Sequence, residues 1–389
     1  MGVKYLMKVL KKYAPDAISE VEYASFAGQV VALDIFLIIY KFVIAIRNKG
    51  SDLQSDDGKM TSHIFGAMSK ITNMLKYGMI PVAVFDGKAP KIKNNTIQER
   101  TKRKKEAIDK MNNEQYKDDY VKYYKRTFNI MGEHIKDVKR LFSLIGFLNV
   151  QAPEEADSQC AALNMSHFVD AVATEDTDVL AFGTNKMLKQ FSSKDKVMEI
   201  DKGKILQDLG LDNGQFIDLC IILGTDYCKR IKGIGPEVAY VEYKKYGNMI
   251  EFLNHLNNVN KKCVKDGKEP KYDIPLQFIE NWEETKEYYK SAIVTDPCEF
   301  TKNPINNYWT KPDKNGLIQF LCVENGFDLD ETNKKIDYLM KRYNLFVKYG
   351  KLDADWNEIN KNKNRNKKRV INVDSGMNRT FNIKSNKVR

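Results

Sequence analysis

The chain has 389 residues, of which 42% are hydrophobic, and this is enough for one large folded domain or two smaller ones. Its six cysteines contain no Cys-x-x-Cys pair and its four histidines are scattered, which argues against a zinc site and a disulfide framework. The formal net charge is +11, and the excess of positive charge lies in residues 88–126, with 13 Lys or Arg against 6 Asp or Glu, and in residues 357–389, with 10 against 2, while the rest of the chain is mildly acidic. Each basic segment is either a solvated surface or a contact for phosphate backbones, and for residues 357–389 a disordered tail is favoured.

The N-terminal residues indicate a soluble, intracellular protein. The segment MGVKYLMKVLKKYAPDA lacks the apolar core of a signal peptide. The longest apolar run, VVALDIFLIIYKFVIAI over residues 30–46, is interrupted by Asp34 and Lys41 and is shorter than a comfortable membrane span. We therefore expect a buried strand that leads into a buried helix, and no association with a membrane.

Strand and helix patterns alternate up to about residue 240. The runs GQVVALD (28–34), MIPVAVFDG (79–87) and FVDAVATED (168–176) are short, apolar and β-branched, as in buried strands. Between them, TSHIFGAMSKITNMLKYG and GEHIKDVKRLFSLIG are long enough for helices. This alternation predicts an α/β fold with a mostly parallel central sheet and helices on both of its faces. Ligands of such folds bind in the crevice beyond the carboxyl ends of the strands.

Acidic residues follow these apolar runs, and a later run, LCIILGT, repeats the arrangement. They are Asp34, Asp86, Glu155, Asp157, Asp176, Asp178 and Asp226. A single carboxylate after a strand is usually a turn or helix-cap residue, but several that converge on one crevice would repel one another unless a cation compensates them. Oxygen ligands without His or Cys select Mg²⁺ or Mn²⁺ over zinc. A set of this size suits two ions about 4 Å apart, which hydrolyse phosphodiesters by activating water.

A basic segment accompanies these acids. In KIKNNTIQERTKRKKEA, Lys93 and Arg100 are seven residues apart, so a helix would place both on one face, and Arg103 and Lys104 extend that face. A cationic helix above an acidic metal site can hold a phosphodiester and stabilise its charge during cleavage. The following segment MNNEQYKDDYVKYYKR is rich in Lys and Tyr and could arch over the crevice.

A pair of glycines marks a turn after Asp226. Gly233 and Gly235 in CKRIKGIGPEVA allow a tight hairpin, and Pro236 suits the first turn of a helix. The amides at such a helix start can bind a DNA phosphate without reading the base sequence. A plain turn is the alternative, and a dinucleotide-binding loop is excluded because Val238 stands at the third glycine position.

Several motifs together resemble those of the flap endonuclease family, the structure-specific 5′ nucleases of replication and repair. In the order and approximate spacing of that family they are MGVKYL, VALDIFLIIYKFVIAIRNKG, MTSHIFGAMSKI, PVAVFDGKAPKIK, APEEADSQCAAL, ATEDTDVLAFG and LCIILGTDYCKRIKGIGPEVA. The resemblance covers roughly residues 1–335 and implies a nuclease core with an N-terminal part over 1–105, a helical gateway and cap over about 88–135, and an internal part over about 136–260. A helix-turn-helix hairpin that binds DNA would lie at 226–245, and residues 336–389 would form a basic, partly disordered extension.

The resemblance also implies the catalytic residues. The seven acids would hold two Mg²⁺ ions, for which Mn²⁺ can substitute, and Lys93 and Arg100 would be the basic pair of the gateway helix. One ligand departs from the family, because Asp157 stands where a Glu is usual. Its shorter reach would alter the spacing of the metal ions or favour a contact through water.

DNA contacts are predicted for eight residues, of which Arg103 and Lys104 follow from the helix face and the others from the resemblance. They are Gly2, Tyr40, Arg47, Thr61, Arg103, Lys104, Gly233 and Gly235. The resemblance places Gly2 and Tyr40 beside the cut, where the aromatic ring stacks on an unpaired nucleotide. It places Arg47 near the DNA junction and Thr61 in a 3′-flap pocket, while the glycine hairpin grips the downstream duplex, often through a bound K⁺.

The C-terminal region departs from the family at the box that binds a sliding clamp, which reads Gln, two residues, an aliphatic, two residues and two aromatics. The nearest match is YGKLDADW, in which Leu352 and Trp356 fit, whereas Tyr349 replaces Gln and Asp355 replaces the first aromatic. A sliding clamp is therefore only a candidate partner. The tail NKNKNRNKKRV (360–370) reads as a nuclear address or as a nonspecific DNA-binding arm.

The function predicted from the sequence is Mg²⁺-dependent hydrolysis of DNA at a 5′ flap or 5′ end, which leaves a 5′-phosphate and a 3′-hydroxyl. A monomer would bind branched DNA through its backbone, in the nucleus or at a site of viral DNA replication. Three alternatives stay open: a sister nuclease for bubbles, junctions or 5′ ends, a noncatalytic DNA-binding scaffold, and a haloacid-dehalogenase phosphatase. The short cap segment favours the flap enzyme, the complete set of acids argues against the scaffold, and Leu180 in DTDVL stands where the phosphatase loop has Thr or Val.

Overall fold

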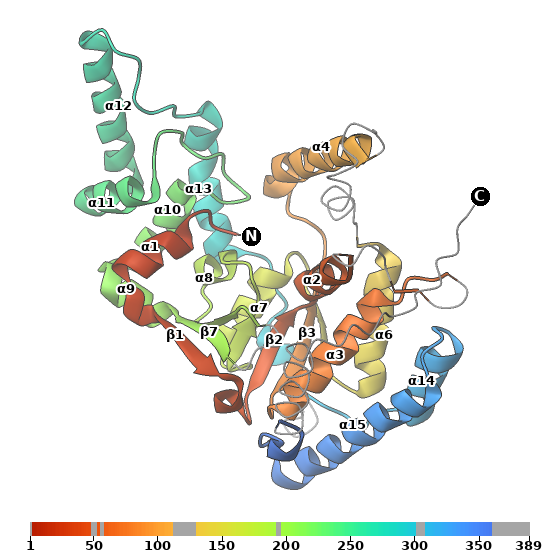
Figure 1. Ribbon diagram of the computed structural model, residues 1–389. Coiled ribbons are helices and arrows are strands. Elements are labelled where there is room, and N and C mark those ends of the chain that lie inside the picture. The colour runs from red at the N-terminus through yellow and green to blue at the C-terminus, as the bar shows by residue number, and fades with distance from the viewer. Residues whose placement is uncertain are drawn as a thin grey trace, which may run out of the picture.

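The computed structural model describes residues 2–47, 53–54, 58–111, 130–191, 196–300 and 308–359 (Figure 1). The described residues form a seven-stranded sheet in the order β1-β7-β6-β5-β2-β3-β4. Its parallel part contains β2 (Val30–Asp34), β3 (Ile80–Phe85), β4 (Asn149–Gln151), β5 (Ala171–Ala173) and β6 (Lys186–Lys189). The predicted α/β fold with a mostly parallel sheet is confirmed.

Neither strand of the antiparallel edge is predicted from the sequence. β7 (Lys196–Asp201) runs antiparallel to β6, and β1 (Ile18–Glu22) runs antiparallel to β7. Both strands are partly exposed and carry charged residues, so their apolar pattern is too weak to mark them as strands. Charged side chains such as Glu20 and Glu22 also disfavour pairing of the edge strand with another chain.

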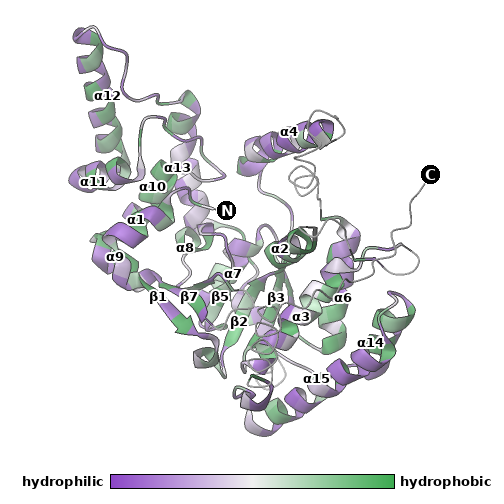
Figure 2. Ribbon diagram, viewed as in Figure 1, coloured by the Kyte–Doolittle hydropathy of each residue, from purple (hydrophilic) through white to green (hydrophobic). Residues whose placement is uncertain are grey.

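Strand side chains alternate between two buried clusters, one on each face of the sheet. On β2, Ala32 joins the first cluster, whereas Val31 and Leu33 join the second. The first cluster is covered by α1 (Leu6–Tyr13), α7 (Ala156–Met165), α8 (Asp178–Phe182), α9 (Lys202–Leu209) and α10 (Asn213–Leu223). The second is covered by α2 (Ile35–Arg47), α3 (Ser62–Lys76), α6 (Gly132–Ile145), α14 (Lys314–Ile318) and α15 (Leu329–Tyr349). Helices therefore cover both faces, and Figure 2 shows hydrophobic central strands beside largely hydrophilic outer helices such as α15.

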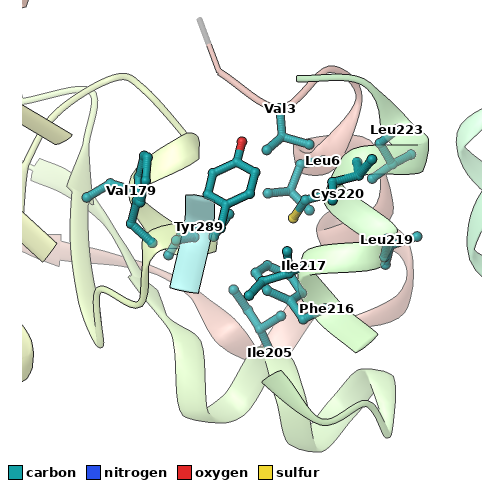
Figure 3. Close-up of a cluster of buried hydrophobic side chains, with 14 of the residues drawn as sticks. Val3, Leu6, Val179, Ile205, Phe216, Ile217, Leu219, Cys220, Leu223 and Tyr289 are labelled. Carbon is teal, nitrogen blue, oxygen red and sulfur yellow. The ribbon is translucent and has the colours of Figure 1, made fainter. Parts of the chain in front are cut away.

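The apolar run before Asp226 is a helix and not a strand, contrary to the prediction. α10 starts with a capping box between Asp212 and Gln215 and is buried over nearly its whole length. Its apolar side chains are Phe216, Ile217, Leu219, Cys220 and Leu223. Figure 3 shows them packed against residues of the N-terminal segment, α8 and α9. Because a helix that is apolar all round has no amphipathic period, its sequence cannot be told from that of a buried strand.

A helical arm follows α10 (Figure 1). It contains α11 (Pro236–Tyr246), α12 (Met249–Lys265) and α13 (Leu276–Ser291). The turn before α11 requires glycine, because Gly233 has a φ of +86° and a Cβ atom there would lie 2.5 Å from the Lys271 carbonyl oxygen. Gly235 caps α11 and Pro236 occupies its first position, so the predicted hairpin and helix start are present.

The basic segment forms α4 (Asn94–Met111), which projects from the sheet domain after a 3-10 turn at Lys91–Lys93 (Figure 1). Its sequence is mostly hydrophilic (Figure 2). Residues 112–129 of the predicted gateway and cap lie outside the described residues.

The folded core extends past the boundary predicted at residue 335. That boundary falls inside α15, whose residues Ile336, Leu339 and Phe346 are buried in the second cluster together with Leu352 and Ile359. The buried residues of α15 lie at helical spacing within a highly charged segment. The composition of the segment therefore indicates a solvated tail, although one face of the helix is apolar. The tail from residue 360 onward lies outside the described residues. None of the described helices is long and apolar enough to cross a membrane.

Candidate active site

The ends of the parallel strands bring the predicted acids to one edge of the sheet. Asp34 ends β2 and Asp86 follows β3. Glu155 and Asp157 lie at the start of α7, beyond β4, and Asp176 and Asp178 lie just before and at the start of α8, beyond β5. Asp226 follows α10. Backbone amides orient two of them. Asp34 Oδ1 accepts a hydrogen bond from the Leu37 amide at 3.2 Å. Asp86 Oδ1 accepts one from the Ala156 amide at 2.8 Å.

Burial and mutual repulsion make several of these carboxylates costly to ionise. Asp34 and Asp178 are only 4% and 2% exposed. Burial raises the pKa of Asp34, Asp157 and Asp178 well above the usual range, and the charges of neighbouring carboxylates raise it further. For Asp157 these neighbours are Asp176, Asp34, Asp178 and Glu155, so acids from different strands share one crevice. Such a group of like charges needs a compensating cation.

Two cations of the basic segment supply part of that compensation. Lys93, the last residue of the 3-10 turn, pairs with Glu155 Oε1, and Arg100 of α4 pairs with Asp226 Oδ2. Burial alone would lower the pKa of Lys93, but Glu155 and the other acids raise it, so its ammonium group stays charged. Thr96 Oγ1 donates to the carbonyl oxygen of Asp226, which joins α4 to the loop after α10. The predicted basic pair therefore lies against the predicted acids.

The chemistry of the predicted ligands fits a divalent cation. All of them are carboxylates, which suit Mg²⁺ or Mn²⁺, and Asp157 Oδ1 is buried with no hydrogen-bond partner among the residues that the structure describes. In that same part of the chain, no three Asp, Glu, His or Cys side chains are already arranged as a metal site. The pairs of Lys93 with Glu155 and of Arg100 with Asp226 each engage one oxygen of a predicted ligand.

Replacing Asp157 by Asn is expected to stabilise the metal-free protein at pH 7, because burial and the neighbouring carboxylates raise the pKa of Asp157 well above its usual range. A carboxylate whose pKa is raised by folding lowers the stability as the pH rises from its unfolded-state pKa to its folded-state pKa, and above both values the cost is constant. Asp157 Oδ1 has no hydrogen bond to lose among the described residues. Urea unfolding in EDTA measures the difference, which should shrink toward pH 4. Equal stability of wild type and Asp157→Asn at pH 7 would show that the charge of Asp157 is not destabilised by burial and by the neighbouring carboxylates.

Three predicted DNA contacts share one cavity with Arg100 of the basic pair. Tyr40 of α2 and Arg100, Arg103 and Lys104 of α4 line a cavity of about 420 Å³. An aromatic ring beside cations is the usual composition of a site for unpaired nucleotides. The cavity therefore adjoins the acidic crevice through Arg100.

The N-terminal segment lies beside the acids, as predicted for Gly2. A Cβ atom on Gly2 would come within 2.0 Å of Asp176 Oδ1. The Lys4 amide donates to the Gly224 carbonyl oxygen at 2.8 Å, and Thr177 Oγ1 donates to the Val3 carbonyl oxygen at 3.4 Å. This segment thus connects the loop of Asp176 and Asp178 with the loop of Asp226.

Three other predicted DNA contacts, Gly233, Gly235 and Thr61, lie outside the crevice. Gly233 and Gly235 lie in the turn before α11. Thr61 is buried at the start of α3, where its amide donates to the Leu53 carbonyl oxygen at 2.8 Å, and it lines neither the crevice nor the cavity of Tyr40. Arg47 ends α2, and its side chain lies outside the described residues.

Tyrosine hydroxyls that reach the acids are missed by the sequence analysis. Tyr227 and Tyr288 both donate to Glu155 Oε2, at 2.5 and 3.1 Å, and Tyr289 donates to Asp178 Oδ1 at 2.9 Å. Tyr227 directly follows a predicted ligand, which is a weak signal for a role in the site. Tyr288 and Tyr289 lie on α13, outside every motif, and only the fold brings them to the acids.

Comparison with known proteins assigns the chain to a family. Residues 1–107 match the XPG N-terminal domain and residues 146–226 match the XPG I-region. These two ranges contain the basic pair and every predicted metal ligand. The flap endonuclease 1-B of Physcomitrium patens is 36% identical over 344 residues, which cover 86% of this chain and 94% of that protein. The chain belongs to the flap endonuclease family.

Solved structures of related nucleases are similar to this chain over most of its length. The flap endonuclease-1 of Methanococcus jannaschii is 28% identical, with a TM-score of 0.63 over 88% of this chain and 98% of that chain. The catalytic core of Rad2 in complex with a DNA substrate is 27% identical, with a TM-score of 0.67 over 87% of this chain and all of that chain. The flap endonuclease fold predicted from the motifs is confirmed.

Proposed function

We propose that this chain is a structure-specific 5′-flap endonuclease and 5′-3′ exonuclease, which hydrolyses DNA phosphodiesters in replication and repair. One observation carries the proposal. Lys93 contacts Glu155 and Arg100 contacts Asp226, so two cations that are able to bind a phosphate face a crevice of carboxylates. Its membership of the flap endonuclease family favours this activity over that of a sister nuclease or a phosphatase. The complete set of acids and the basic pair argue against a scaffold without catalytic activity.

The residues of the crevice divide the work of hydrolysis. Two Mg²⁺ ions, or Mn²⁺, would be held by Asp34, Asp86, Glu155, Asp157, Asp176, Asp178 and Asp226. When bound, such ions supply Lewis acidity and an acidic water molecule. Lys93 and Arg100 leave their acidic partners and bind the scissile phosphate, whose growing negative charge they stabilise. The oxygen of water bonds to phosphorus, the P–O3′ bond breaks and one proton of the water passes to O3′, which leaves a 5′-phosphate and a 3′-hydroxyl.

DNA is bound through its backbone and its unpaired strand. Tyr40 stacks on a nucleotide in the cavity that it shares with Arg103 and Lys104. The start of α11, at Gly233 and Gly235, binds the downstream duplex through backbone amides, and K⁺ at this hairpin stays a prediction. We expect a monomer that works inside the cell where DNA is replicated, in the nucleus or at a viral replication site.

The candidate clamp box is used by the chain itself. Leu352, the aliphatic residue expected to enter a clamp, is 1% exposed in the second core cluster. The Asp355 amide donates to the Lys76 carbonyl oxygen at 2.7 Å, and a Cβ atom on Gly78 would come within 2.6 Å of the Leu352 carbonyl oxygen. In the box, Tyr349 and Trp356 are 60% and 56% exposed, whereas the position expected to enter a clamp is buried. We infer that residues 350–359 anchor the end of the core and do not dock on a clamp through Leu352.

Replacing Leu352 by Ala is expected to lower the free energy of unfolding by about 3 kcal/mol, because it removes a fully buried side chain. The matched control is Trp356→Ala in the same segment, which should change it by less than about 0.5 kcal/mol. Urea unfolding of the full chain measures both. A neutral Leu352→Ala variant would show that the segment is not an anchor.

Metal dependence provides the experiment for the proposed chemistry. A labelled double-flap DNA is incubated with the protein in EDTA and then with Mg²⁺ or Mn²⁺ in excess. We expect no cleavage in EDTA and cutting near the flap base with either ion. Cleavage that persists in EDTA would disprove the metal mechanism, and bound but uncut DNA with every divalent ion would disprove the nuclease.

A further inference from the structure

The acids Glu155 and Asp178 receive hydrogen bonds from a cluster of tyrosines. Tyr288 and Tyr289 are neighbours on α13, yet they reach acids at the starts of two different helices, α7 and α8. Glu155 has both oxygens engaged, since Oε1 pairs with Lys93 while Oε2 accepts from the tyrosine hydroxyls. In the proposed mechanism the Lys93 side chain leaves Glu155 when a phosphate binds, whereas the tyrosine hydroxyls stay hydrogen-bonded to the acids.

The tyrosine rings are held rigidly. Tyr289 is 2% exposed and packs within 4.8 Å, centroid to centroid, of Phe182, which lies on the same short helix as Asp178. Tyr227 contacts the rings of both Tyr288 and Tyr289 at 5.1 and 5.3 Å. Figure 3 shows Tyr289 next to apolar side chains that include Val179. Aromatic packing of this kind fixes the hydroxyls in space.

The anchoring of α13 extends this rigidity to the helix itself. Lys286, just before the tyrosine pair on α13, donates to Asp218 of α10 at 2.7 Å. Asp218 lies outside the acidic crevice. α13 is therefore tied to α10 on one side and to the predicted metal ligands on the other.

We propose that Tyr288 and Tyr289 are positioning residues, which hold Glu155 and Asp178 in the orientation that divalent ions require. This inference rests on the proposed function, because it takes both acids as ligands. A hydroxyl is a neutral donor, so it orients a carboxylate while leaving its negative charge available to a metal ion. The hydrogen bonds occupy one oxygen of each acid, Glu155 Oε2 and Asp178 Oδ1.

The test measures Mn²⁺ binding to the full chain without DNA, with electron paramagnetic resonance as the readout. Tyr288→Phe and Tyr289→Phe keep the rings and remove the hydroxyls, and each is expected to weaken Mn²⁺ binding about 10- to 100-fold. Tyr243→Phe is the matched control, because it removes a hydroxyl from a buried carboxylate that is not a predicted ligand. It should lower the melting temperature as much as Tyr289→Phe does while leaving Mn²⁺ affinity unchanged.

The outcomes separate this inference from the proposed function. If Asp178→Ala loses Mn²⁺ affinity while both Tyr→Phe variants bind as wild type does, the tyrosines do not position the ligands and the metal site stands. If Tyr243→Phe weakens binding as much as Tyr289→Phe, the effect is one of general stability and the inference is wrong. If wild type binds no Mn²⁺, or binds it equally without Asp178, the proposed metal site itself fails.

Discussion

Replacing Asp178 by Asn is expected to slow flap cleavage by about 10³-fold, since losing one metal ligand removes about 4 kcal/mol of transition-state stabilisation. Asn has nearly the same shape, and its carbonyl oxygen can still accept the hydrogen bond from Tyr289. The fold should therefore persist. Single-turnover cleavage of a labelled double flap measures the rate, and fluorescence anisotropy in EDTA measures DNA binding, which should stay within about 3-fold of wild type because the variant loses no phosphate contact.

An aspartate at the other end of β5 provides a control for that variant. Asp170 lies before β5, at the opposite edge of the sheet, where its Oδ2 accepts a hydrogen bond from the Val30 amide at 2.7 Å. Asp170→Asn should cleave at nearly the wild-type rate. An Asp178→Asn enzyme that retains a tenth or more of wild-type activity would remove Asp178 from the metal site.

Replacing Lys93 or Arg100 by Ala is expected to lower the cleavage rate by about 10²- to 10³-fold, the usual effect of removing one group that stabilises transition-state charge. Each cation now faces an acid, Glu155 or Asp226, in the crevice where the scissile phosphate must lie. The affinity for flap DNA should fall much less, because each variant loses a single phosphate contact out of many. Rates at saturating enzyme separate the two effects.

Lys102→Ala is the matched control for the basic pair. Lys102 lies on α4 and is exposed, but it does not line the cavity of Tyr40 and Arg100. It should change cleavage by less than about 3-fold, as expected for a charge in the solvated part of the helix. If Lys102→Ala and Arg100→Ala reduce cleavage equally, α4 acts through general charge and not through a defined pair.

The position of most acids could be predicted from the sequence because strand ends follow from simple patterns. Asp34 and Asp86 end apolar runs with β-branched residues, and parallel strands share one carboxyl edge. Asp226 is placed correctly in the crevice for a wrong reason, since the run before it is the buried helix α10. An apolar segment of that length fits either element.

The tyrosines and the C-terminal anchor could not be predicted, because both depend on long-range packing. Tyr288 reaches Glu155 across 133 residues of sequence, through a helix whose position is set by contacts with α8 and α10. Leu352 looks like a remnant of a clamp box, and only its burial beside the turn at Gly78 shows that it belongs to the core. No local pattern reports either contact.

The most direct test of the central claim is substrate choice by the wild-type protein in Mg²⁺. Four labelled DNAs are compared at equal concentration: a double flap, a blunt duplex, a bubble and a four-way junction. We predict cutting near the base of the 5′ flap, slower removal of nucleotides from the duplex 5′ end, and little cleavage of the other two. Preferred cutting of the bubble or the junction would contradict the assignment as a flap endonuclease.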